Sequence, residues 1–173
     1  MTRAVRRATI DDVWPIHETA RASWHAAYDE LLGAETVDDV VDEWYGLGDL
    51  ESSIVAATGR DDAEFLVVDR TDDPELADCR GFVHAVPWPE DSTVAYVVTL
   101  HVSPEAWREG TGTTLLAALE ETVGDSFDAV RLAVLADNEI GVSFVESASF
   151  ERVATRESGL GDELLEYVYE KPL

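Results

Sequence analysis

Apolar residues along the chain follow two different periods, and the longer period predicts helices. In residues 9–32 they recur at intervals of three and four, the spacing that places side chains on one face of a helix. The apolar positions of this stretch are Val13, Ile16, Ala20, Trp24, Ala27 and Leu31. Thr9, which precedes two aspartates, is expected to cap the start of this helix. Four further helices are predicted over residues 35–45, 49–57, 111–123 and 138–148.

Seven short stretches are predicted as strands, most clearly the continuous apolar run of residues 63–70 and the β-branched run of residues 92–102. They cover residues 3–9, 63–70, 79–88, 92–102, 128–136, 150–158 and 161–173. The turn sequence "TDDPELAD" between the second and third runs indicates a hairpin. One strand and three helices come first, followed by three strands, a helix, a strand, a helix and two strands. This order predicts a single α/β domain over residues 1–173, in which a mostly antiparallel hairpin region joins a βαβ unit.

Composition changes this picture mainly at the surface. The 173 residues are enough to bury a core, yet 37 acidic residues face 12 basic ones, and Lys171 is the only lysine. A nucleic-acid partner is not expected, because phosphate contacts need clustered Lys and Arg. A net charge of −25 repels itself in dilute buffer, whereas molar salt shortens the screening length to about 3 Å. This balance resembles that of proteins from salt-accumulating archaea, with an ordinary acidic mesophilic protein as the alternative.

Signals for membranes, secretion and metals are missing from the sequence. No apolar run approaches the roughly 18 residues that span a bilayer. The opening "MTRAVRRATIDDVW" has basic residues but no apolar core behind them, unlike a secretory signal. A single cysteine, Cys79, leaves neither an internal disulfide nor a cysteine-rich metal site. We therefore expect a cytoplasmic protein with no metal and no membrane segment.

The stretch "SPEAWREGTGTTLLAAL", residues 103–119, carries the first chemical signal. Gly110 and Gly112 lie between a predicted strand and a predicted helix, where free backbone N–H groups and the helix dipole favour an anion. A pyrophosphate fits such a turn, and a tight turn without a ligand is the alternative. A Walker loop needs a lysine that is missing here. A Rossmann turn needs a third glycine and an earlier place in the chain.

Two motifs in the correct order resemble the GNAT superfamily of N-acetyltransferases. "LHVSPEAWREGTGTTLL" resembles its acetyl-CoA motif, and "VLADNEIGVSFVESASF" resembles the motif that follows, with Asn138, Phe144 and Phe150 at matching spacings. The resemblance covers nearly the whole chain. It implies a mixed, mostly antiparallel sheet of about six to seven strands flanked by helices on both faces. It also implies an acetyl-CoA-dependent N-acetyltransferase that moves the acetyl group directly to a primary amine within a ternary complex.

The resemblance carries cofactor contacts onto individual positions. A strand segment would bond the pantetheine arm, the glycine turn would wrap the pyrophosphate, and the next helix would reach the cofactor from its start. In that order these residues are Leu100, His101, Val102, Arg108, Glu109, Gly110, Thr111, Gly112, Thr113, Asn138 and Phe144. Arg108 also places a positive charge beside the polyphosphate of an acidic protein.

The chain departs from the family pattern at several positions. Trp107 stands at a usual Gln/Arg position, and Ser149 replaces a common Gly. Val145 occupies the place where the family often has Tyr, the proton donor to the departing thiolate. Several members have a Glu base where this chain has Tyr96, which is a poor base at neutral pH. A general acid or base typically contributes about 10²- to 10⁴-fold, so the loss of the Tyr slows such an enzyme without abolishing it.

Other residues are candidates for the missing roles. His101 and His84 have a suitable pKa if they reach the cleft, and a packed strand histidine is the alternative for each. Tyr167 and Tyr169 could replace the proton donor, although ordinary packing is favoured. In "SWHAAY" on the first helix, Trp24 is expected in the core, while the acceptor side is left to His25 and Tyr28.

Three interpretations of function remain open at this point. The first is the N-acetyltransferase, with a small-molecule or peptide amine as acceptor and a homodimer as one possible assembly. The second is a non-catalytic acyl-CoA-binding sensor or interaction module, supported by Val145 and Tyr96. The third, a binder of some other phosphate, fails if the strand Leu100–Val102 separates from its neighbour to admit a pantetheine.

Overall fold

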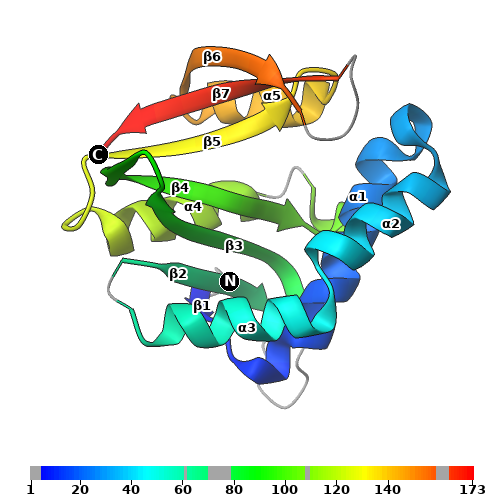
Figure 1. Cartoon of the computed structure of the whole chain (residues 1–173), viewed down its shortest axis with the longest axis horizontal. Helices are drawn as coiled ribbons and strands as arrows, with labels where there is room; N and C mark the ends of the chain where they lie inside the picture. Colours follow the sequence, from blue (N-terminus) through cyan, green and yellow to red (C-terminus); the bar gives the residue numbers. More distant parts are fainter. Residues whose placement is uncertain (1–4, 61, 70–78, 108–109, 159–163) are drawn as a thin grey trace.

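Seven strands form one mixed sheet in the order β1-β2-β3-β4-β5-β7-β6 (Figure 1). The computed structural model describes residues 5–60, 62–69, 79–107, 110–158 and 164–173. The strands are β1 (Val5–Arg7), β2 (Glu64–Asp69), β3 (Cys79–Trp88), β4 (Asp91–Val102), β5 (Ala129–Leu135), β6 (Glu151–Glu157) and β7 (Leu165–Pro172). All neighbouring strands pair antiparallel except β4 and β5, which are parallel. Both the predicted hairpin of β2 with β3 and the βαβ unit are confirmed.

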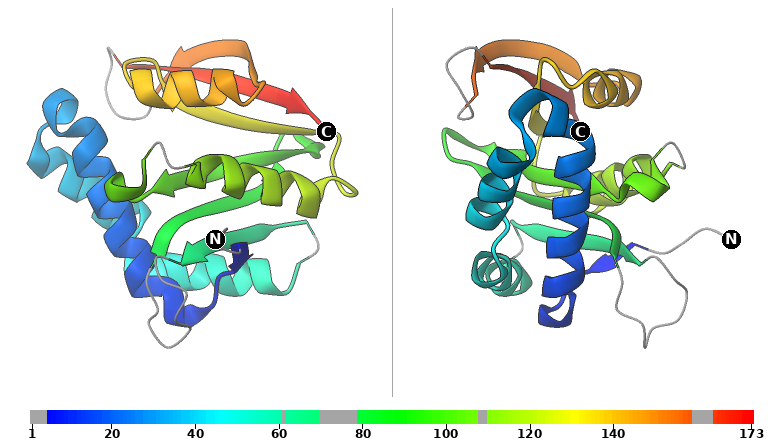
Figure 2. Two further views of the ribbon diagram at one scale, coloured as in Figure 1. Left: turned by 180° about the vertical axis from the view of Figure 1, so that it is seen from behind. Right: turned by 90° about the vertical axis from the view of Figure 1, so that its right-hand side faces the viewer.

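Five helices cover the two faces of this sheet (Figure 2). They are α1 (Val13–Leu32), α2 (Ala34–Trp44), α3 (Leu47–Thr58), α4 (Thr111–Val123) and α5 (Glu139–Ser147), with short 3₁₀ turns η1 (Ile10–Asp12) and η2 (Pro104–Ala106). The first three helices lie on one face, and α4 and α5 lie on the other. The expected α/β class, the strand number and the helices on both faces are confirmed. Among the described residues, no helix has the length and apolarity that crossing a membrane would require.

Strand alternation explains why the sheet supports two cores. In β2, Phe65 and Val67 pack toward α1, α2 and α3, whereas Leu66 and Val68 pack toward α4. Successive side chains of a strand point to opposite faces, so a continuous apolar run such as "FLVV" predicts a strand that is covered on both sides. The four side chains are all buried.

The apolar stripe of α1 differs from its prediction near the end of the helix. Ile16, Ala20 and Trp24 are buried as expected, but Leu31 is 40% exposed and Tyr28 is buried instead. The stripe therefore continues at i+4 steps from Trp24 to Tyr28. This shift buries the phenol ring of Tyr28 instead of the side chain of Leu31.

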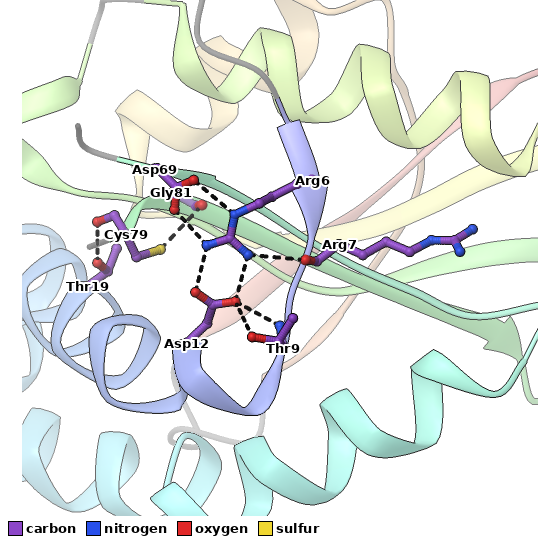
Figure 3. Close-up of polar contacts among 8 residues, drawn as sticks. All are labelled: Arg6, Arg7, Thr9, Asp12, Thr19, Asp69, Cys79 and Gly81. Carbon is purple, nitrogen blue, oxygen red and sulfur yellow. Dashed lines mark hydrogen bonds and ion pairs between the residues drawn. The ribbon is translucent and has the colours of Figure 1, made fainter. Parts of the chain in front are cut away.

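A partly buried ion cluster joins β1 and the turn η1 to β2 (Figure 3). The guanidinium of Arg6 in β1 donates to both carboxylate oxygens of Asp12 at 2.7 and 2.8 Å, and to both of Asp69 at 2.7 and 2.9 Å. The Asp12 carboxylate also accepts from the backbone N–H of Thr9 at 2.7 Å. Burial raises the pKa of Asp12, but the Arg6 and Thr9 hydrogen bonds outweigh it and hold the pKa below its ordinary value.

Cys79 lies close to this cluster at the start of β3 (Figure 3). Its thiol donates to the carbonyl of Gly81, and its own carbonyl accepts from the hydroxyl of Thr19 at 2.8 Å. Burial raises the pKa of the thiol to about 12. The side chain therefore stays a protonated, packed thiol at neutral pH.

Candidate functional site

The strands β4 and β5 separate halfway along their length. Their parallel pairing covers Val94–Tyr96 opposite Ala129–Arg131, yet β4 continues to Val102 and β5 to Leu135. The two ribbons diverge from this paired end in Figure 1. The third interpretation of the sequence, a binder of some other phosphate, was to be rejected if the strand Leu100–Val102 separated from its neighbour. The strand does separate, so we discard that interpretation.

The separated strands enclose a cleft of about 1180 Å³. Val97 and Leu100 line it from the side of α4, and Thr99 and His101 line it from the side of α1. The cleft therefore passes through the sheet from one face to the other. Parts of α1, α4 and α5 complete its walls. An extended ligand can enter from one face while a second ligand approaches from the other.

A β-bulge at Val98 produces this two-sided lining. Val97 pairs with Ala85 and Thr99 pairs with His84, so Val98 has no partner in β3. The extra residue reverses the alternation along the rest of β4. As a result, the hydroxyl and imidazole of Thr99 and His101 face the first three helices instead of α4.

The glycine turn leaves the start of α4 open to an anion. Gly110, the N-cap residue, has φ +83°, a left-handed conformation that favours glycine. No described side chain caps the helix, and its first turn carries no acidic residue. Thr111, Gly112 and Thr113 line the cleft. Arg108 and Glu109, which belong to the same expected contact set, lie outside the described residues.

Gly112 lies against the ring of Phe144 in α5. A Cβ atom at position 112 would come within 3.0 Å of two ring carbons of Phe144. The glycine thus permits α4 and α5 to approach each other where both line the cleft. Nearby, the indole of Trp107 donates to the carbonyl of Val102 at 2.8 Å, so this side chain secures the end of β4.

Asn138 caps α5 and reaches across to α1. Its Oδ1 accepts from the backbone N–H of Gly141 at 3.0 Å, and its Nδ2 donates to the hydroxyl of Tyr28 at 2.9 Å. Tyr28 lines the cleft as well. The two expected contacts, one for the cofactor and one for the acceptor side, are therefore bonded directly to each other.

His101 sits in the cleft wall with its lone pair already engaged. The indole N–H of Trp24 donates to Nε2 at 3.1 Å, so Nε2 carries no proton. The Tyr45 hydroxyl, 2.9 Å from the same nitrogen, must then donate to it as well. Nδ1 carries the proton and faces the hydroxyl of Ser23 at 3.5 Å. Burial lowers the pKa of His101 to about 4, so the ring is neutral at pH 7.

The other two candidate bases occupy different places. His84 stacks on Phe65 at 4.9 Å on the side of the first three helices, and burial lowers its pKa to about 4. It is not among the described residues that line the cleft. Tyr96 does line the cleft. Its ring packs at a tilt against Trp88, with 4.6 Å between the ring centroids, and its hydroxyl accepts a long hydrogen bond of 3.4 Å from Arg156.

His25 does not join Tyr28 in the cleft wall. Its two ring nitrogens lie 2.6 Å from Asp29 and 2.8 Å from Asp38. Burial lowers the pKa of His25, but the two carboxylates outweigh it and raise the pKa above the ordinary value. Both carboxylates accept hydrogen bonds, so the protonated ring clamps α1 to α2. It is not among the described residues of the cleft.

The C-terminal tyrosines pack on the face that carries α5. The ring of Tyr167 lies under the guanidinium of Arg152 at 4.3 Å, and the Tyr169 hydroxyl donates to Glu146 at 3.4 Å. Neither tyrosine is among the described cleft residues, whereas the aliphatic Val145 lines the cleft wall and is only 4% exposed. Packing, the favoured interpretation of both tyrosines, agrees with these contacts.

Several cleft residues were not anticipated from the sequence. Trp44 and Tyr45 come from the end of α2, and the ion pair of Arg156 with Glu166 comes from β6 and β7. These residues lie on the face opposite α4 and α5. Alternation along the last two strands was the only available signal in the sequence for this pair. Arg156 and Glu166 are direct cross-strand partners, so their opposite charges lie side by side.

Comparison with known proteins agrees with this architecture. Residues 16–150 match the sequence model described as the acetyltransferase (GNAT) family. The chain belongs to the acetyltransferase (GNAT) family. The resemblance drawn from the two motifs is thus confirmed, as is the expectation of an N-acetyltransferase. No curated protein matches the sequence significantly.

Solved structures show the same fold at low sequence identity. The PaiA N-acetyltransferase from Thermoplasma acidophilum, in complex with coenzyme A, is similar with a TM-score of 0.84 and 24% identity over 100% of both chains. Ard1 from Thermoplasma volcanium is similar with a TM-score of 0.68 and 18% identity, over 100% of this chain and 99% of that one. Arabidopsis thaliana NAA60, in complex with a bisubstrate analogue, has a TM-score of 0.66 and 16% identity, with 99% and 98% covered.

Proposed function

We propose that this GNAT protein transfers an acetyl group from acetyl-CoA directly to a primary amine in a ternary complex. The observation that carries the proposal is the separation of β4 from β5 beside an uncapped helix start. An extended thioester ligand needs a slot between strands for its arm and N–H donors for its phosphates. The fold places both at the same cleft, and its second opening admits an acceptor.

The proposed cofactor contacts follow the cleft from the sheet to α4. Leu100, His101 and Val102 hold the pantetheine arm along β4, and residues 108–113 surround the pyrophosphate with their backbone N–H groups. Asn138 and Phe144 contact the arm from α5. The fit is supported by the left-handed Gly110 and by the described first turn of α4, which carries no acidic residue to repel an anion. The CoA thioester supplies an activated acetyl group.

The amine approaches from the opposite face. Aromatic side chains of α1 and α2 form one wall there, and Tyr96, Arg156 and Glu166 form another. An alkylamine with a pKa near 10.4 is about 99.9% protonated at pH 7, so deprotonation costs roughly 4 to 5 kcal/mol. Since the lone pair of His101 is shared by Trp24 and Tyr45, we propose that water takes the excess proton of the amine. Both small-molecule and peptide amines fit this class of acceptor.

A sensor that binds acyl-CoA without turnover is the second candidate. The observation that favours it is Val145, a buried aliphatic residue at the position of the usual proton donor. A thiol has a pKa near 8.5 and leaves far more easily than an alkoxide. The loss of the donor therefore weakens the enzyme proposal without removing it.

The test is a transfer assay with three sets of acceptors. Acetyl-CoA and protein are mixed with alkylamines, with peptides that have a free N-terminus, or with lysine peptides whose N-terminus is blocked. Free thiol and the mass of each amine are then measured. We expect thiol release together with an acetylated amine in at least one set. Binding of acetyl-CoA without release in any set would favour the sensor.

The acidic composition of the chain bears on the solvent in which the protein works. We propose a cytoplasmic protein adapted to high salt, because 37 acidic residues against 12 basic ones repel each other least where salt screens them. The same charge argues against nucleic acid as a partner. Assays should therefore be carried out in molar KCl. Under the same conditions, the mass of the protein in solution tests whether it forms a homodimer.

A further inference from the structure

The orientation of the Asn138 amide is fixed by its own helix. A backbone N–H can only donate, so the side-chain atom that faces the N–H of Gly141 at 3.0 Å must be the oxygen. The nitrogen then faces Tyr28, 2.9 Å away. A Cβ atom on Gly141 would come within 2.7 Å of that nitrogen. The glycine thus leaves the space that this arrangement needs.

The Tyr28 hydroxyl must therefore act as an acceptor toward Asn138. An amide N–H₂ group donates and does not accept, so the phenolic proton has to point elsewhere. Among the described residues, no acceptor for this proton lies within hydrogen-bonding distance of Tyr28. The side chain lines the cleft, so the phenolic proton is left for whatever fills the cleft, a water molecule or an acceptor atom of a bound ligand.

The surroundings of Tyr28 hold the phenol in place and keep it protonated. Its ring packs on Trp24 at 4.7 Å and is 8% exposed. Burial raises the pKa of Tyr28 to about 12. A phenol of this pKa is a hydrogen-bond donor at every working pH, but it is too weak an acid to give its proton fully to a thiolate.

We propose that Tyr28 donates a hydrogen bond to the departing sulfur of acetyl-CoA and supplies from α1 what Val145 cannot supply from α5. This proposal rests on the proposed function. The amine lone pair forms the C–N bond, and the C–S bond breaks with its electron pair going to sulfur. The developing thiolate accepts the hydrogen bond of Tyr28, while the excess proton of the amine goes to water. A donor aimed at a developing charge stabilises the transition state more than the ground state.

The first readout does not depend on turnover. The pKa of the CoA thiol is measured in the complex of the wild-type protein with free CoA, by the pH dependence of thiolate absorbance. We expect it to lie about one unit below that of CoA in solution, because one hydrogen bond favours the thiolate. In a Tyr28→Phe variant, which keeps the ring and its packing on Trp24, this lowering should be lost. A bound thiol whose pKa equals that of free CoA in the wild type would overturn the proposal, even if the variant failed to fold.

The second readout separates binding from chemistry. We expect Tyr28→Phe to bind acetyl-CoA within about twofold of the wild type and to lower kcat about 10- to 100-fold, the scale of one hydrogen bond to a charged group. Tyr167→Phe, on the far side of β7, is the matched control and should change neither. If the wild type binds acetyl-CoA and transfers it, but Tyr28→Phe retains the full kcat, only the role of Tyr28 fails. If the folded wild type does not bind acetyl-CoA at all, the proposed function fails first.

Discussion

The indole N–H of Trp24 lies 3.1 Å from Nε2 of His101 and fixes the tautomer of that histidine. The ring accepts at Nε2 and carries its proton at Nδ1, so it cannot gain a second proton without displacing the indole N–H of Trp24. His101, a candidate base from the sequence, thus links β4 to α1 and to Tyr45, the residue that follows α2. The same arrangement has consequences for stability.

Acid should destabilise the protein through two histidines. Burial lowers the pKa of both His84 and His101 from 6.5 to about 4. Between these pH values the two histidines are protonated in the unfolded chain but not in the folded chain. Their contribution to the free energy of unfolding is therefore complete above pH 6.5 and falls as the pH approaches 4. Each histidine can contribute up to about 3 kcal/mol. Urea unfolding as a function of pH, in molar KCl, measures the loss.

Single substitutions show how much each of the two histidines contributes to the loss of stability in acid. His101→Gln keeps an acceptor for Trp24 and should remove one of the two contributions to the pH slope, and His84→Gln should remove the other. High salt is needed because the changing charge of 37 acidic residues would otherwise add its own pH dependence. An unfolding free energy that stays flat between pH 6.5 and 4 would contradict the assignment.

Substitution of Gly112 by alanine should disturb the cofactor side of the cleft. The new Cβ atom would lie 3.0 Å from the Phe144 ring, and overpacking of this kind costs about 1–3 kcal/mol. Because Phe144 also lines the cleft, we expect weaker acetyl-CoA binding in a calorimetric titration. Gly48→Ala in α3 is the control, since a Cβ there meets nothing within 4 Å. Equal affinities for both variants would argue against close packing of Gly112 and Phe144.

The pH dependence of the reaction should report the acceptor instead of a histidine. With water as the proton acceptor, kcat/KM for an alkylamine should rise about tenfold per pH unit toward its pKa near 10.4. For a peptide N-terminus the rise should level off near pH 8, the ordinary pKa of an α-amino group. Initial rates with both acceptors test this directly. An inflection near pH 6.5 shared by both would indicate a working histidine.

The cluster of Arg6, Asp12 and Asp69 should matter for stability alone. Asp12→Asn removes the charge from hydrogen bonds of 2.7 and 2.8 Å to Arg6, and bonds to charged groups contribute about 1.5–3 kcal/mol. We expect a loss of about 2 kcal/mol in urea unfolding, with unchanged acetyl-CoA affinity. Asp62→Asn breaks a comparable pair with Arg60 whose side chains are 47% and 49% exposed, and should cost clearly less, because an exposed ion pair contributes little to stability. Equal losses of unfolding free energy in the two variants would contradict a special role of the Arg6 cluster in stability.

Local patterns were sufficient to predict most of the architecture. The strand Cys79–Trp88 agrees with its prediction at both ends, and the helix that follows Gly110 begins where the glycine turn places it. These features depend on periodicity and backbone conformation, which neighbouring residues largely determine. The start of α1 differs, because a 3₁₀ turn held by Asp12 precedes Val13.

The chemistry of the cleft was less predictable because it depends on contacts between distant elements. No glycine or proline marks the bulge at Val98 in the sequence, yet the bulge determines on which face of the sheet His101 lies. Trp24 and Tyr45 determine the protonation of that histidine from separate elements. The bond between Asn138 and Tyr28 spans 110 positions of sequence. Periodicity places each of these residues on an element, but only the packing angles between elements bring them together.

The most direct test of the account is a calorimetric titration of acetyl-CoA into the folded protein in about 2 M KCl, which screens the acidic surface. We expect saturable binding by the wild type, the same affinity for Gly48→Ala, and weaker binding by Gly112→Ala. Addition of a reactive amine to the saturated complex should then release thiol. A folded wild-type protein that produces no binding heat, and whose melting temperature acetyl-CoA does not raise, would contradict the assignment of the cleft between β4 and β5 as the acetyl-CoA site.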